Sequence, residues 1–158
     1  MITLYHGSNV DIEKIDLSLS RKGKDFGCGF YLNANKQQAM DMAIRTTNRM
    51  KTGKPTICAF TFDESRLTSD ILNIKIFDDY SVEWAEFIFK NRNRQLHFLH
   101  DYDIVIGPIA NDGVAYLLGR YEEGTLSIYE LSKELIYKKL NRQYYFGTEK
   151  SIKYLKRL

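Results

Sequence analysis

The sequence predicts a compact α+β protein, and three observations support this fold class. The chain has 158 residues, of which 44% are hydrophobic, so it suits one hydrophobic core and is too short for two ordinary domains. Strand-like and helix-like segments are interleaved irregularly, without the strict βαβ alternation of a doubly wound sheet. The sequence contains no repeat and no linker-like stretch. We therefore expect a single domain over residues 1–158.

Three apolar runs in the first half of the chain predict strands: Ile2–His6, Phe30–Leu32 and Thr56–Phe62. The first run is followed, through Lys24, by a loop rich in Ser, Asp, Lys and Gly, and we expect this loop to run over the functional site. The segment 36–51 predicts a helix, which Asn33 or Asn35 can cap and which Gly53 ends.

The second half of the chain predicts three more strands and three more helices. Alternating or continuous apolar runs indicate the strands: Leu72–Phe77, Asp103–Pro108 and Gln143–Phe146. Periodic or capped segments indicate the helices: Val82–Arg92, Leu126–Tyr137 and Glu149–Leu158. Ser81 and Thr148 can cap the first and the last of these helices. Pro108 ends its strand, because proline has no N–H to donate to a ladder.

Charge and composition narrow the class of function. The formal net charge is +3, which permits a phosphate-bearing ligand but is weaker than the basic footprint of a typical nucleic-acid-binding domain. Two cysteines without metal-ligand spacing and three histidines predict no metal site. No run approaches the roughly 18 apolar residues of a membrane span, and no signal-peptide pattern follows Met1. We expect a soluble, cytoplasmic protein with no membrane partner.

Two short motifs each place a polar ring beside small residues. Leu4-Tyr5-His6-Gly7-Ser8 presents His6, and the stretch 25–33 presents Tyr31 among glycines. Glycine lacks a Cβ, so a ligand can approach its main-chain groups closely, and a tyrosine lying flat offers a stacking face. The two motifs together predict a site for a planar, hydrogen-bonding ligand. A hydrogen-bonded structural histidine and a core tyrosine remain the alternative interpretation.

The same residues resemble a known superfamily. His6 with Gly7 on a first strand, and Tyr31 on a second strand followed at once by a helix, resemble the diphtheria-toxin and poly(ADP-ribose) polymerase branch of the ADP-ribosyltransferases. Four longer segments are similar to DUF3990, a small bacterial family of that superfamily often found beside toxin-antitoxin-like partners: 25–33, 84–92, 102–112 and 143–155. The resemblance implies an ADP-ribosyltransferase-like domain with two packed, mostly antiparallel sheets flanked by helices.

The resemblance also implies a ligand and roles for individual residues. NAD is the implied co-substrate, with His6 bonded to a ribose hydroxyl, the main chain of Gly7 bonded to the carboxamide, and Tyr31 stacked on the nicotinamide ring. The third position of the triad, an acid in this branch with variants, opens a late strand and is best matched by Gln143. The implied catalytic residues are His6, Tyr31 and Gln143, and the implied NAD-binding residues are His6, Gly7, Ser8, Arg21, Phe30 and Tyr31. Arg21 suits a pyrophosphate, although a solvated loop arginine explains it equally well.

Gln143 keeps a hydrogen bond but supplies no negative charge, so we expect slow or acceptor-assisted transfer of single units and no elongation. An acid elsewhere can replace it: Glu83, Glu86 or Glu149. Favourable interaction with a helix dipole already explains Glu83 and Glu149, and an exposed helix position is the ordinary explanation of Glu86.

The expected function is NAD-dependent mono-ADP-ribosyl transfer to a protein or nucleic-acid acceptor. The resemblance suggests the toxin of a toxin-antitoxin pair, with an antitoxin partner, or a phage-defence effector. A catalytically weak module that binds NAD or ADP-ribose, and an NAD glycohydrolase, are the alternatives. RNA 2′-phosphate transfer is disfavoured, because its pattern uses a second histidine and an arginine. Asn111 and Asp112 either line the acceptor side or form a simple turn.

Overall fold

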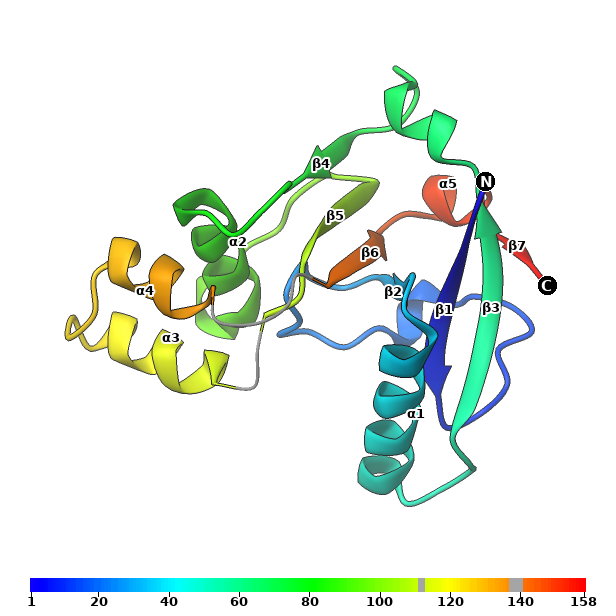
Figure 1. The fold of residues 1–158 in the computed structure, drawn as a ribbon, viewed down its shortest axis with the longest axis horizontal. Helices are drawn as coiled ribbons and strands as arrows, with labels where there is room; N and C mark the ends of the chain where they lie inside the picture. Colours follow the sequence, from blue (N-terminus) through cyan, green and yellow to red (C-terminus); the bar gives the residue numbers. More distant parts are fainter. Residues whose placement is uncertain (111–112, 137–140) are drawn as a thin grey trace.

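A computed structural model describes residues 1–110, 113–136 and 141–158, and within them one sheet carries the fold (Figure 1). Its seven strands run in the order β4-β5-β6-β2-β1-β3-β7. The neighbours are antiparallel except β4 and β5, which are parallel. The strands are β1 (Ile2–Ser8), β2 (Phe30–Asn33), β3 (Thr56–Phe62), β4 (Ile74–Ile76), β5 (Ile104–Pro108), β6 (Arg142–Phe146) and β7 (Lys156–Arg157).

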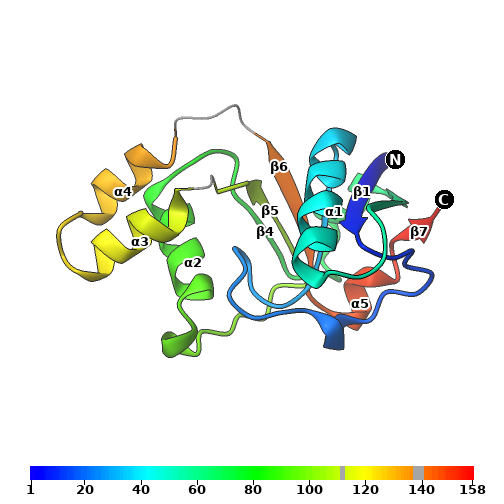
Figure 2. The same ribbon diagram turned by 90° about the horizontal axis from the view of Figure 1, so that it is seen from below.

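Four of the five helices described fall into two groups along this sheet. The five are α1 (Lys36–Met50), α2 (Val82–Arg92), α3 (Val114–Glu122), α4 (Ile128–Glu134) and α5 (Glu149–Ile152). Helix α1 lies against β1 and β3, whereas α2, α3 and α4 gather at the other end of the molecule, beyond β5 (Figures 1 and 2). In the described parts of the chain, no helix combines the length and the apolar character needed to cross a membrane.

Local signals explain where the predicted helices begin. The side chain of Asn35 accepts hydrogen bonds from the main-chain N–H groups of Gln37 and Gln38 and so caps α1. Ser81 caps α2 in the same way, and that helix has the predicted bounds. The strand β3 also matches its prediction. The strands and helices, interleaved along one chain, confirm the predicted compact α+β class.

The structure corrects the prediction of two packed sheets. Tyr5 of β1 pairs with Asn33 of β2, and this pair joins the β4-β5-β6-β2 half to the β1-β3-β7 half in one sheet. Both faces are covered: Val105 and Tyr145 belong to a core cluster with Trp84, whereas their strand neighbours belong to a second cluster around Leu4 and Phe62. Side chains alternate along a strand, which explains the division.

Three helix predictions also need correction. The terminal helix ends at Ile152, because residues 156–157 pair with the free edge of β3 and form β7 instead. Helix α4 is shorter than predicted and starts at Ile128, where Ser127 and Glu130 form a reciprocal capping box; Tyr137 lies outside the described residues. Helix α3 was not predicted, since Gly113 precedes it and offers no capping side chain.

Candidate functional site

The sheet brings the three predicted catalytic residues onto neighbouring strands. His6 lies on β1, Tyr31 on β2 and Gln143 on β6, and these strands are adjacent in the order β6-β2-β1. The register pairs Asn33 with Gln143 and Tyr31 with Tyr145. Residues 6, 31 and 143 therefore lie on three successive strands of the sheet although they are distant in the sequence.

The strands β1 and β2 separate beside His6. From Tyr5 onwards β1 continues its pairing with β3, as His6 with Cys58 and Gly7 with Ile57, whereas its register with β2 is the single pair Tyr5 and Asn33. The His6 ring bridges the gap, with Nδ1 lying 2.7 Å from the main-chain oxygen of Tyr31. Because a carbonyl oxygen only accepts, Nδ1 donates, and Nε2 of the neutral ring is left as an acceptor.

The surroundings of His6 favour this neutral form. Burial lowers the pKa of His6, and the positive charge of Lys24 lowers it further, against an opposing effect of the hydrogen bond to Tyr31. The ring is also stacked on Phe30, with centroids 4.4 Å apart. We conclude that His6 presents an unprotonated Nε2 at neutral pH, in an orientation fixed by two contacts.

Two residues of the predicted NAD-binding set have local structural partners. Phe30 is buried in the core cluster around Leu4, and its ring supports His6. Ser8 is 7% exposed, and its Oγ accepts a hydrogen bond from the Val10 main-chain N–H. These contacts account for both residues without a ligand.

Gly7 is required by the packing of α1. A Cβ at this position would lie 1.9 Å from the main-chain oxygen of Ala39 and 2.7 Å from the nitrogen of Ala43. Only glycine lets β1 and α1 approach so closely. Contact between Gly7 and a carboxamide stays a prediction.

Tyr31 is held by its hydroxyl group and by its ring. The hydroxyl donates to the main-chain oxygen of Gly27 at 2.7 Å and accepts from the N–H of Phe26 at 3.0 Å. Burial, followed by the charge of Asp25, raises the pKa of Tyr31 well above its usual value, so the phenol stays neutral. The ring meets Tyr145 edge-on at 5.4 Å, and the Nζ of Lys24 lies over it, 4.8 Å from its centroid.

Positive charge gathers around Lys24. Its pKa is lowered mainly by burial and then by the charges of Arg21 and Arg49, partly offset by Cys28 and Asp25. Arg21 comes from the loop before β2, and Arg49 from the last turn of α1. The predicted loop therefore contributes Lys24, which lies over the Tyr31 ring, and an anionic group near Lys24 would relieve its repulsion by Arg21 and Arg49.

Gln143 is bonded to a carboxylate that sequence reasoning missed. Its Nε2 donates to Oδ2 of Asp25 at 2.8 Å and lies 3.4 Å from the main-chain oxygen of Pro108. Asp25 is 7% exposed, and its Oδ1 accepts from Nε of Arg92 at 2.7 Å. Asp25, rather than any of the three glutamates proposed from the sequence, is thus the acid next to Gln143. Its place at the start of the Tyr31 motif was the available signal.

The other acids have different surroundings. Glu83 pairs with Lys75, and Glu149 lies in the first turn of α5.

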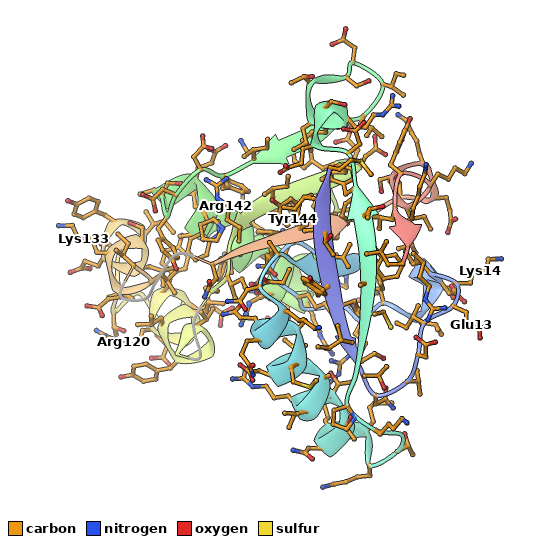
Figure 3. All side chains as sticks on the ribbon, turned by 45° about the vertical axis from the view of Figure 1, so that its right-hand side comes forward. Glu13, Lys14, Arg120, Lys133, Arg142 and Tyr144 are labelled. Carbon is orange, nitrogen blue, oxygen red and sulfur yellow. The ribbon has the colours of Figure 1, made fainter. Side chains whose placement is uncertain are left out.

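On β6, Gln143 lies between Arg142 and Tyr144, which Figure 3 labels. Arg142 donates to the main-chain oxygen of Asp78 at 2.8 Å. Asn111 and Asp112 lie outside the described residues.

An open cleft of about 470 Å³ is lined in part by Arg92. It lies between the turn at Gly23, the end of α2 and helix α3, and its lining includes Phe89, Arg94 and Glu122. Arg92 therefore both lines the cleft and pairs with Asp25. In the described residues, no group of three or more His, Cys, Asp or Glu side chains is placed to hold a metal ion.

These features define an α+β protein whose central strands carry a neutral histidine, a fixed tyrosine and a glutamine bonded to an acid. Residues 2–157 match the family model DUF3990, which is described as a protein of unknown function. The chain therefore belongs to the DUF3990 family. None of the curated proteins matches it.

The effect of Lys24 on His6 can be measured directly. We expect Lys24→Met to raise the pKa of His6, because the change removes a positive charge that disfavours the imidazolium. An NMR titration of the His6 ring measures this shift. The neighbouring change Lys22→Met is the control and should leave the titration of His6 as in the wild type. An unchanged His6 titration in Lys24→Met would show that the Lys24 charge does not act there.

Proposed function

We propose that this protein is an NAD-dependent mono-ADP-ribosyltransferase whose site lies where β1, β2 and β6 meet. The observation that carries the proposal is the placement of His6, Tyr31 and Gln143 on three adjacent strands, with the His6 ring bonded to the Tyr31 main chain. The resemblance of the His6-Gly7 and Tyr31 motifs to those of the ADP-ribosyltransferases supports this proposal.

Binding would begin when the pyridinium of NAD replaces the Lys24 ammonium on the face of the Tyr31 ring. The nicotinamide of NAD is a pyridinium, and both it and an ammonium group favour the negative face of an aromatic ring. Lys24, which lies over that face, would move aside and meet the pyrophosphate together with Arg21. Nε2 of His6 would then accept the hydrogen of a ribose hydroxyl.

The chemical step would break the bond between C1′ of the ribose and the nicotinamide nitrogen. The bonding electrons leave with nicotinamide, and positive charge develops on the ribose as an oxocarbenium-like state. The carbonyl dipole of Gln143 would stabilise that charge through the 2′-hydroxyl, since fixed dipoles aimed at developing charge lower a barrier. An oxygen or nitrogen of the acceptor then bonds to C1′ and loses its proton to solvent.

Release of nicotinamide tests the proposal. Purified protein incubated with NAD and fractionated cellular protein, RNA and DNA should release nicotinamide and label one fraction, which also identifies the class of acceptor. We expect His6→Asn to lower the rate about 100-fold, the usual effect of losing one positioned polar group. His97→Asn is the matched control, because His97 is exposed and has a left-handed backbone that asparagine tolerates.

The result that would refute the proposal is wild-type protein that neither binds NAD nor releases nicotinamide with any fraction. If transfer occurs, slowed growth on expression of the wild type but not of His6→Asn would support a toxin role, and unaffected growth would count against it.

Gln143 favours a second candidate, a module that binds NAD or ADP-ribose without transferring it. Glutamine gives no full negative charge to the reacting ribose. Under this alternative the wild type binds NAD but releases no nicotinamide with any fraction. Wild-type turnover that Gln143→Ala abolishes would eliminate the binding-only function.

A further inference from the structure

The amide of Gln143 has a defined orientation. Its Nε2 approaches two oxygen atoms, Oδ2 of Asp25 at 2.8 Å and the main-chain oxygen of Pro108 at 3.4 Å. A carbonyl and an ionised carboxylate are acceptors only. Turning the amide by 180° would place Oε1 against both acceptors, so the surroundings permit one orientation.

The orientation leaves Oε1 as the unused group of the amide. Among the described residues Oε1 has no hydrogen-bond partner, and none of the fully buried side-chain nitrogen and oxygen atoms described lacks a partner. Oε1 is therefore open to solvent or to a ligand. A carbonyl oxygen in that position accepts a hydrogen bond, as an oxygen of a carboxylate would.

Arg92 determines which oxygen of Asp25 is left for Gln143. Its Nε and Nη2 both bind Oδ1 of Asp25, which leaves Oδ2 to Gln143. The carboxylate thus binds a cation through one oxygen and the amide through the other. The hydrogen bond from Gln143 is charge-assisted, and it polarises the amide so that Oε1 becomes more negative.

We propose that Asp25 is a positioning residue, which turns the Gln143 amide so that its oxygen, and not its NH₂ group, faces the substrate. This inference rests on the proposed function, in which the oxygen receives the ribose 2′-hydroxyl. Asp25 and Gln143 together present the acceptor that a single glutamate presents elsewhere. In this arrangement the acid, Asp25, lies one hydrogen bond away from the substrate and acts through the Gln143 amide.

Asp25→Asn is the decisive change, because the variant side chain has one acceptor and one donor. The guanidinium of Arg92 takes the oxygen, so the new NH₂ group faces Gln143. The 2.8 Å contact with residue 25 then outweighs the longer 3.4 Å contact with the Pro108 oxygen, so we expect the Gln143 amide to turn over and point its own NH₂ group towards the substrate. We expect kcat for nicotinamide release to fall about 100-fold, with a much smaller change in KM for NAD.

A second exchange should reverse the loss. In Asp25→Asn combined with Gln143→Glu, the asparagine NH₂ donates to one carboxylate oxygen and the other oxygen faces the substrate. We expect most of the lost kcat to return, together with a new dependence of kcat on pH from the titrating carboxyl at position 143. Asp103→Asn is the matched control, because Asp103 is also a buried, ion-paired carboxylate and should lose stability without loss of kcat.

NMR reports the orientation without any activity. In the wild type the Gln143 side-chain NH₂ should be protected from hydrogen exchange by its bonds to Asp25 and Pro108, and in Asp25→Asn this protection should be lost. Unchanged protection would overturn the inference whether or not the protein is an enzyme. An active wild type whose kcat survives Asp25→Asn, or a double variant no faster than Asp25→Asn, would also overturn it. A wild type with no turnover instead refutes the proposed function alone.

Discussion

Gly7→Ala is expected to lower the free energy of unfolding by about 3 kcal/mol, the upper end of what overpacking usually does. The added methyl group would lie 1.9 Å from the Ala39 oxygen and 2.7 Å from the Ala43 nitrogen. Both are main-chain atoms of a helix, so no side chain can rotate away. Relief requires α1 to move off β1. Chemical denaturation of the two proteins measures the difference.

Gly119→Ala is the matched control for that experiment. Gly119 lies inside α3, and an added Cβ there meets no atom within 4 Å. Alanine in a helix interior is more favourable than glycine by up to about 1 kcal/mol, so this variant should be slightly more stable than the wild type. Wild-type stability of Gly7→Ala would contradict the close contact between α1 and β1.

The elements that could be predicted from the sequence are those with local causes. Asn35 and Ser81 cap their helices through N–H groups a few residues away, so their signals lie in a short window of sequence. The strand β7 has no such signal, because Arg157 is held by pairing with Phe60. The joining of two expected sheets into one likewise depends on the distant pair Tyr5 and Asn33.

The same distinction applies to the candidate site. His6 and Tyr31 stand out beside glycines in short motifs, and the structure brings them together through one hydrogen bond. Asp25 stands in the same motif as Tyr31, but its pairing with Gln143 could not be predicted, since the two residues are 118 positions apart in the sequence. The contact also depends on Arg92, at the end of a third element.

The ion pair between Asp25 and Arg92 should make a large contribution to stability. Asp25 has a side chain that is 9% exposed, and that of Arg92 is 29% exposed, so the pair is largely shielded from water. Arg92→Met removes the cation and leaves a buried carboxylate without its main partner. We expect a loss of about 3 kcal/mol, at the low end of the range for breaking a buried pair because Arg92 is partly exposed. Chemical denaturation measures this loss.

The interpretation of that loss depends on two companion variants. Combining Arg92→Met with Asp25→Asn removes both charges, so part of the stability should return, whereas a loss that came from the missing arginine stem would persist. Arg157→Met breaks a more exposed pair with Asp11, whose side chains are 37% and 52% exposed, and it should change stability little. Equal losses in Arg92→Met and Arg157→Met would show that burial of Asp25 does not decide the effect. A selective loss would show that the buried pair of Arg92 with Asp25, the carboxylate that Gln143 also contacts, contributes more to stability than the exposed pair of Arg157 with Asp11.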